Sequence, residues 1–250
     1  MADKALAQAG ALNRPAGQDP GPKFTMRYKL AWRWKAFQCW AHYAFTGRRR
    51  GVPGLIDFVL GNYYFRAMQV PSEISALGEI LAELRPEHAL EIGTAQGGTL
   101  FLLTRLASPQ ATIVSVDLPG GMFGGGYSAR RRWFYQRFAR RKQRLHLLQG
   151  DSHSGEMLGQ VNAALVGQPL DYLFIDGDHR YDGVKRDFVM YGPLVRKGGF
   201  IAFHDIVDGP SDNVGGVPQF WREIKSHYRH LEIIYDPLQG GYGIGGLYVE

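Results

Sequence analysis

One stretch decides the fold of this chain: residues 89–99 read Ala-Leu-Glu-Ile-Gly-Thr-Ala-Gln-Gly-Gly-Thr. The first five residues are mostly apolar and are typical of a buried strand, and residues 97–107 carry apolar side chains at helical spacing. A strand that turns through glycines into a helix leaves free N–H groups where a ligand can approach the backbone. The stretch therefore predicts a strand–loop–helix unit with a ligand site at its loop.

Similar units follow along the chain. We expect strands at 89–93, 111–117, 145–150, 171–176, 199–204, 231–235 and 243–249, and helices at 72–84, 97–107, 129–142, 156–166, 181–191 and 218–228. Alternating strands and helices predict a mostly parallel sheet with helices on both faces, and Ser72 is a candidate cap for the first helix. Only a glycine-rich turn region separates the last two strands, which favours an antiparallel hairpin at one edge of the sheet.

The N-terminal part of the chain has a different character. Residues 1–27 are rich in Ala, Gly and Pro without apolar periodicity, which predicts a disordered arm. Residues 28–45 combine aromatic and basic side chains at helical spacing, so we interpret 28–70 as a helical cap segment before a main domain at 71–250. In the plainer interpretation, the helical cap segment packs on the main domain or on a second subunit. Contact of residues 28–50 with a membrane surface is the alternative.

Length and composition exclude several classes of protein. The 250 residues suit one large α/β domain with an appendage, and the 45% of apolar residues with 21% charged residues exclude wholesale disorder. The single cysteine, Cys39, excludes an internal disulfide and a cysteine-based zinc cage. Because the sequence has neither a long uncharged apolar run nor a secretory signal pattern, we expect a cytoplasmic protein.

The formal net charge of +6 resides partly in residues 130–144, where arginines alternate with aromatic residues at helical spacing. A solvated helix face with its aromatic side chains turned inward is the plainer interpretation, and a docking face for an anionic ligand or a membrane is the alternative. Because no nucleic-acid-binding motif accompanies these residues, we expect no nucleic-acid partner.

The ends of the predicted strands carry the candidate ligand residues. In an open α/β sheet, ligands bind beyond the carboxyl ends of the strands. The first strand ends in the glycine-containing loop 93–98, the second ends at Asp117, and the third leads into Asp151 and Ser152. A carboxylate at the second strand can accept both hydroxyls of a ribose, and one at the third can accept from an adenine amino group. Together these strand ends predict a cofactor that contains adenosine.

The glycine spacing narrows the choice of cofactor. It matches neither the dinucleotide fingerprint nor a P-loop. The acidic rim of Glu91, Asp117 and Asp151 suits a zwitterionic sulfonium better than a pyrophosphate. The pattern Glu-x-Gly-x-x-x-Gly-Gly, followed by an acidic second strand end, resembles the class I S-adenosylmethionine-dependent methyltransferases. This resemblance implies a Rossmann-like, seven-stranded, mostly parallel sheet with an antiparallel final strand. The S-adenosylmethionine-binding residues that it implies are Glu91, Gly93, Thr94, Gly97, Gly98, Asp117, Asp151, Ser152 and Asp176.

Three later segments, at 120–127, 174–181 and 198–205, resemble the subfamily of cephalosporin hydroxylase-like proteins and macrolide-sugar O-methyltransferases. The resemblance implies an enzyme that methylates a hydroxyl of a sugar or another small polar or natural-product acceptor. We also expect the protein to form a homo-oligomer. It also implies that His179 is the general base, because an alkyl hydroxyl must lose its proton to become a good nucleophile. The alternative for His179 is a loop histidine bonded to the backbone. The alternatives for the whole chain are a non-catalytic methyltransferase-like partner protein and a membrane-surface glycolipid methyltransferase.

A metal site is predicted beside that base. Asp176 ends the fourth strand, and His204 and Asp205 end the fifth, so neighbouring strands about 4.8 Å apart bring these side chains to one place. In the related sugar enzymes the matching positions hold Mg²⁺ on the acceptor hydroxyls. His204 stands where those enzymes have a carboxylate, and an imidazole favours Mn²⁺ or Fe²⁺ more than an all-oxygen set does. Alternatively, His204 supports the ligands or acts as a base, or the three residues merely terminate buried strands.

Overall fold

The structure of this protein, a computed structural model, describes residues 34, 37–39, 41, 43, 51–62, 64–120 and 126–250. The predicted arm at 1–27, most of the predicted helix at 28–45 and residues 121–125 lie outside the described residues. The expectations about disorder and about membrane contact at 28–50 therefore stay predictions. Among the described residues, no helix combines the length and apolarity that a membrane span requires.

The described residues contain a seven-stranded sheet in the order β3-β2-β1-β4-β5-β7-β6. The strands are β1 (His88–Ile92), β2 (Thr112–Asp117), β3 (Arg144–Gln149), β4 (Leu170–Ile175), β5 (Val195–His204), β6 (Arg229–Ile233) and β7 (Ile244–Tyr248). β1 to β5 pair in parallel, whereas β7 runs antiparallel to both β5 and β6. The mostly parallel sheet with a reversed final strand is confirmed. The strand at this edge of the sheet is β6, because β7 lies between β5 and β6.

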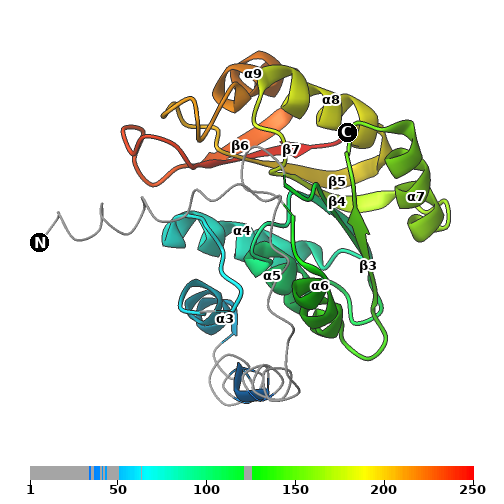
Figure 1. Ribbon diagram of the computed structural model, residues 1–250. Helices are drawn as coiled ribbons and strands as arrows, with labels where there is room; N and C mark the ends of the chain where they lie inside the picture. The colour runs from blue at the N-terminus through cyan, green and yellow to red at the C-terminus, as the bar shows by residue number, and fades with distance from the viewer. Residues whose placement is uncertain are drawn as a thin grey trace, which may run out of the picture.

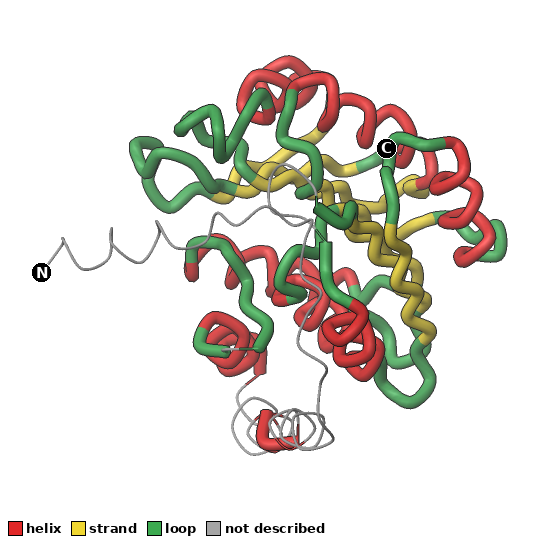
Figure 2. Tube along the Cα trace, viewed as in Figure 1, coloured by secondary structure: helices red, strands yellow, loops and turns green. Residues whose placement is uncertain are grey.

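Helices cover both faces of this sheet (Figures 1 and 2). One face carries α3 (Gly51–Leu60), α4 (Pro71–Leu84), α5 (Gly98–Leu106) and α6 (Ala129–Tyr135), and the other carries α7 (Gly155–Leu165), α8 (Tyr181–Tyr191) and α9 (Val217–Ile224). Short 3₁₀ turns follow at Gln136–Phe138, Gly192–Leu194 and Lys225–His227. Each face has its own hydrophobic cluster. β2 and β4 are buried along their whole length, as expected for parallel strands that are covered by helices on both faces.

Three predicted helix ends differ from the structure. The predicted helix 129–142 ends at Tyr135 and passes into a 3₁₀ turn, and the side chain of Gln143 accepts from the N–H of Arg140 in a later turn. The predicted helix 218–228 ends at Ile224, also before a 3₁₀ turn. The helix predicted to be capped by Ser72 begins at Pro71 and has Val70 as its N-cap. Proline suits the first helical position because its missing N–H needs no partner there.

The segment before residue 71 packs on the sheet domain. Phe65 lies between two rings of the domain, with centroid distances of 4.6 Å to Phe101 and 4.8 Å to Phe138. Phe58 of α3 lies 5.6 Å from Phe101, measured between ring centroids. Phe134 and Phe138 are buried in this cluster, so the aromatic side chains of the basic segment turn inward as the plainer interpretation predicts. The domain boundary at residue 71 stays a prediction.

Candidate active site

The glycines at the start of α5 are required by close protein contacts. A Cβ on Gly97, whose φ is 79°, would lie 2.6 Å from the ring of Tyr135. A Cβ on Gly98 would lie 2.0 Å from the backbone nitrogen of Ala67. We expected these two positions to leave room for a ligand, but the space beside each is filled by the protein itself. The role of the two glycines is therefore to let α5 approach its neighbours closely.

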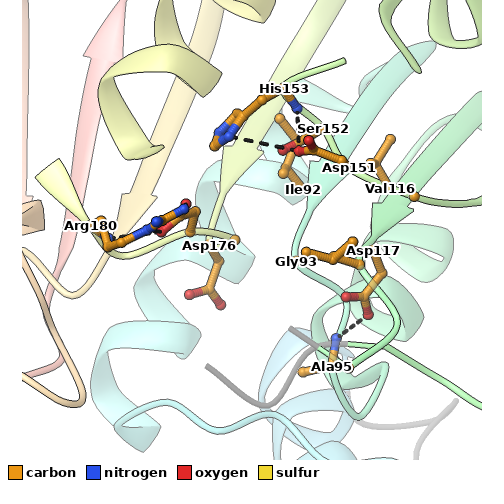
Figure 3. Close-up of a pocket in the computed structure, with 15 residues that line it drawn as sticks. Ile92, Gly93, Ala95, Val116, Asp117, Asp151, Ser152, His153, Asp176 and Arg180 are labelled. Atoms are coloured by element: carbon orange, nitrogen blue, oxygen red, sulfur yellow. Dashed lines mark hydrogen bonds and ion pairs between the residues drawn. The ribbon is translucent and has the colours of Figure 1, made fainter. Parts of the chain in front are cut away.

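A cavity of about 620 Å³ lies beyond the carboxyl ends of β1 to β4 (Figure 3). Its volume is in the range of small-molecule sites. Of the nine residues predicted to bind the cofactor, five line this cavity: Gly93, Asp117, Asp151, Ser152 and Asp176. Gly93 lies between the two aspartates Asp117 and Asp176, and a Cβ on it would lie 1.9 Å from the carbonyl oxygen of Asp176. The structure thus brings the three predicted strand ends together around one cavity.

Asp117 joins two loops at the rim of this cavity. One carboxylate oxygen accepts from the N–H of Ala95 at 2.9 Å, and the other accepts from the N–H of Gly126 at 2.8 Å. Burial raises the pKa of this carboxyl, although these backbone hydrogen bonds lower it. Each carboxylate oxygen can still accept a further hydrogen bond. Asp117 can therefore hold its own loops and a ligand hydroxyl at the same time.

Asp176, His179 and Asp205 form a second cluster next to the cavity. One potential ligand atom of each residue lies within 4.8 Å of the others, and Asp176 also lines the cavity. Two carboxylates and an imidazole are a donor set that suits a divalent metal such as Mg²⁺ or Mn²⁺. The sequence predicted the two carboxylates together with His204, whereas this group of three includes His179. The set of metal ligands therefore stays a prediction.

His204 lies against the same two carboxylates. Its Nδ1 is 3.1 Å from Asp176 Oδ1 and 3.5 Å from Asp205 Oδ2, and its Nε2 is buried without a hydrogen-bond partner. Burial lowers the pKa of this imidazole, but the two carboxylates outweigh burial and raise it well above its usual range. His204 therefore contacts both carboxylates through Nδ1, and its place among the metal ligands stays a prediction.

His179 is held by a backbone contact and by both acids. Its Nδ1 bonds to the carbonyl oxygen of Asn213, and its Nε2 lies 3.5 Å from Asp176 Oδ1. Burial lowers the pKa of His179, but the bonds to Asp176 and Asn213 and the charge of Asp205 together raise it. A backbone bond at Nδ1 fixes the orientation of the ring and turns Nε2 toward Asp176. The backbone bond predicted by one interpretation of His179 is present, and it is compatible with the other interpretation, in which His179 is the general base.

The segment that carries both groups of residues matches a known family. Residues 90–206, from within β1 to just after β5, match the model of a family described as a methyltransferase domain. Residues 90–206 therefore resemble a methyltransferase domain, within the Rossmann-like sheet described above. The cavity and the cluster both lie within these residues.

Solved structures of O-methyltransferases share the fold of this chain. The O-methyltransferase TomG from Streptomyces achromogenes, involved in tomaymycin synthesis and solved with SAM, is 17% identical; the match covers 87% of this chain and 98% of TomG, with a TM-score of 0.55. An O-methyltransferase from Bacillus cereus, solved with SAH, is also 17% identical. The match covers 85% of this chain and 97% of that enzyme, with a TM-score of 0.55. At such identities the likeness establishes the fold.

A curated relative matches only a short piece of the chain. The uncharacterized protein R132 of Acanthamoeba polyphaga mimivirus is 54% identical over 39 residues. The match covers 16% of this chain and 18% of that protein.

Glu91 and Thr94 are not among the residues that line the cavity. Both side chains are buried, and the Thr94 hydroxyl donates to Glu91 Oε2 at 3.0 Å. Burial raises the pKa of Glu91 to about 8, so this carboxyl is mostly protonated at neutral pH. The acidic rim expected from the sequence therefore lacks Glu91, because its side chain points into the core and contributes no exposed charge.

Side chains of α8 form hydrogen bonds with the turn at residues 151–153. Tyr191 donates its hydroxyl to the carbonyl of Ser152 at 2.6 Å, and Arg186 donates to the carbonyl of His153 at 2.9 Å. His153 Nε2 lies 3.3 Å from Oδ1 of Asp187, whose side chain is completely buried. Sequence reasoning missed this pair. The available signal was an aspartate on the buried face of the predicted helix 181–191.

This histidine–aspartate pair makes stability depend on pH. The hydrogen bond that the Asp187 carboxylate accepts from His153 raises the pKa of this histidine in the folded protein, more than burial lowers it. The pair's contribution to stability is therefore complete below the unfolded pKa of about 6.5 and is lost as pH rises through the folded pKa. We expect the free energy of unfolding, measured by urea titration, to fall more steeply above pH 6.5 in the native protein than in His153→Gln. Parallel pH curves for the two proteins would show that the pair contributes nothing.

Proposed function

We propose that this protein is an S-adenosylmethionine-dependent O-methyltransferase whose acceptor hydroxyl is held beside Asp176, His179 and Asp205. One observation carries the proposal: Asp176 belongs both to the cavity suited to the cofactor and to the acid–histidine cluster. A methyl donor in the cavity and a hydroxyl at the cluster would therefore lie on two sides of one side chain. TomG and the Bacillus cereus enzyme, which share the fold, are O-methyltransferases solved with SAM and SAH.

Bound S-adenosylmethionine supplies an electrophilic methyl group on its sulfonium. The residues of the chain have two tasks: to place the acceptor oxygen in line with that methyl group, and to remove the hydroxyl proton. Asp117 binds the ribose hydroxyls, and Asp151 accepts from the adenine amino group. His179 accepts the hydroxyl proton at Nε2, while its Nδ1 stays bonded to Asn213. A divalent ion, which Asp176 and Asp205 would hold, supplies polarisation of the hydroxyl and lowers its pKa.

The direct test combines binding and turnover. Calorimetry of the full chain is expected to show binding of S-adenosylmethionine and S-adenosylhomocysteine, and radiolabelled methyl groups are expected to reach at least one hydroxylated acceptor of a panel. Failure of both compounds to bind would overturn the proposal. Binding without transfer to any acceptor would instead support the alternative of a non-catalytic methyltransferase-like partner.

Removal of divalent ions distinguishes the role of the acid–histidine cluster from that of the cofactor cavity. We expect exhaustive chelation to abolish methyl transfer and leave cofactor affinity nearly unchanged, because the ion is proposed to hold the acceptor and not the cofactor. Turnover with and without chelator and calorimetry on the same samples measure the two effects, and added Mg²⁺ or Mn²⁺ should restore activity. Full activity after chelation would assign Asp176 and Asp205 to orienting His179 and His204.

A further inference from the structure

The loop between β6 and β7 is fastened at both ends by one buried carboxylate. Glu73 of α4 is completely buried. Its Oε1 accepts from the N–H of Tyr235 at 3.1 Å and from the side chain of Gln239 at 2.7 Å, and its Oε2 accepts from the N–H of Gly243 at 2.9 Å. A buried polar group is costly unless it is hydrogen-bonded. The three hydrogen bonds of Glu73 therefore hold this loop, which projects beyond the ends of β6 and β7 (Figure 1).

The same loop places Tyr242 beside the acid–histidine cluster. Its backbone N–H donates to Asp205 Oδ1 at 3.0 Å, and its carbonyl accepts from the N–H of Val207 at 3.0 Å. Its ring centroid lies 6.0 Å from that of His204, with an interplanar angle of 65°. Tyr242 is 42% exposed, so one part of the ring lies against His204 and the rest faces solvent.

The backbone of Tyr242 is in a conformation that favours glycine. Its φ is 61°, between Gly241 with a φ of 120° and Gly243 with a φ of 80°. A tyrosine in this conformation strains the backbone, and residues of this kind concentrate at ligand sites. Glycine at position 242 would give the same turn without that strain. The side chain of Tyr242 therefore has a use that the backbone does not explain.

Strand order places this ring on the acceptor side of the site. The cavity residues follow β1 to β4, Asp176 ends β4, Asp205 follows β5, and Tyr242 precedes β7, which is the next strand of the sheet. Along the edge of the sheet, the order is therefore cofactor cavity, cluster and then Tyr242. An acceptor whose hydroxyl lies at the cluster, with the methyl donor on one side, has Tyr242 on its other side.

We propose that Tyr242 forms a wall of the acceptor site and selects acceptors whose hydroxyl is carried by a ring, over open-chain alcohols. This inference rests on the proposed function. The apolar face of a sugar ring or of an aromatic ring packs on the exposed face of a tyrosine, whereas a small open-chain polyol offers no such face. Glu73 is a positioning residue that keeps the loop, and through it the tyrosine ring, in place.

Binding to the product complex tests this inference without turnover. The full chain is saturated with S-adenosylhomocysteine and titrated with three probes, namely methyl β-glucoside, catechol and glycerol, with affinities measured by ligand-observed NMR. We expect at least one ring probe to bind more tightly than glycerol, and the better of the two identifies the kind of ring. Tyr242→Ala is expected to weaken that probe about tenfold, Tyr242→Phe to retain its affinity, and both to bind S-adenosylhomocysteine normally.

Tyr235→Ala is the matched control, because Tyr235 is a tyrosine of the same loop with a 72% exposed side chain and only its backbone contacts Glu73. We expect it to leave all affinities unchanged. Glu73→Gln is expected to weaken the ring probe and leave S-adenosylhomocysteine affinity unchanged; loss of both would overturn its positioning role. The inference is overturned if neither ring probe binds better than glycerol, or if Tyr242→Ala binds the ring probe as the native protein does. Failure to bind S-adenosylhomocysteine would instead count against the proposed function.

Discussion

His179→Ala is expected to lower turnover by about 10²–10⁴-fold at saturating S-adenosylmethionine, which is the usual contribution of a general base. The reason is that no other group would then take the hydroxyl proton at this position. Affinity for the cofactor should change little, because His179 does not line the cavity. Single-turnover kinetics with radiolabelled S-adenosylmethionine measure the rate, and calorimetry measures the affinity.

Two further variants make this test specific. His179→Gln can still bond to the carbonyl of Asn213 but cannot take a proton, so it should be as slow as the alanine variant. His227→Ala removes an exposed histidine in the 3₁₀ turn after α9 and should have native turnover. Near-native turnover in His179→Ala would show that the metal or His204 activates the hydroxyl and that His179 is a loop residue.

Asp117→Ala is expected to weaken S-adenosylmethionine binding by about 1.5–3 kcal/mol, because a charged hydrogen-bond acceptor is lost. This corresponds to a rise in Kd of about 10- to 150-fold, which calorimetry resolves. The structure adds a second cause, since the same carboxylate holds the N–H groups of Ala95 and Gly126. The loops on both sides of the cavity should therefore loosen together.

The two causes can be separated. Asp117→Asn keeps the size of the side chain and one acceptor oxygen, so it should retain part of the affinity. Asp208→Ala removes an exposed carboxylate that pairs with Arg222 on the surface, and it should bind the cofactor normally. Urea unfolding of each variant without cofactor reports the contribution of the two loops to stability. Unchanged cofactor affinity in Asp117→Ala would refute the placement of the ribose.

The sequence by itself determined the order of strands and helices and the places where ligand residues gather. Apolar runs and helical spacing are local patterns, and strict alternation leaves few sheet topologies. Because parallel strands end at one edge of the sheet, Asp117, Asp151 and Asp176 could be expected around one cavity before any coordinate was known. The convergence of Asp176 with His204 and Asp205 followed from the same rule.

Only the tertiary structure decided what each of these residues touches. Gly97 opposes Tyr135, His153 pairs with Asp187, and Glu73 holds a loop more than 160 residues away along the chain. Such contacts depend on how helices pack on the sheet, and no local pattern of residue types encodes packing between distant segments. For the same reason Glu91, an acid at a strand end like Asp117, lies protonated in the core: its strand position was predictable, but the burial of its side chain was not.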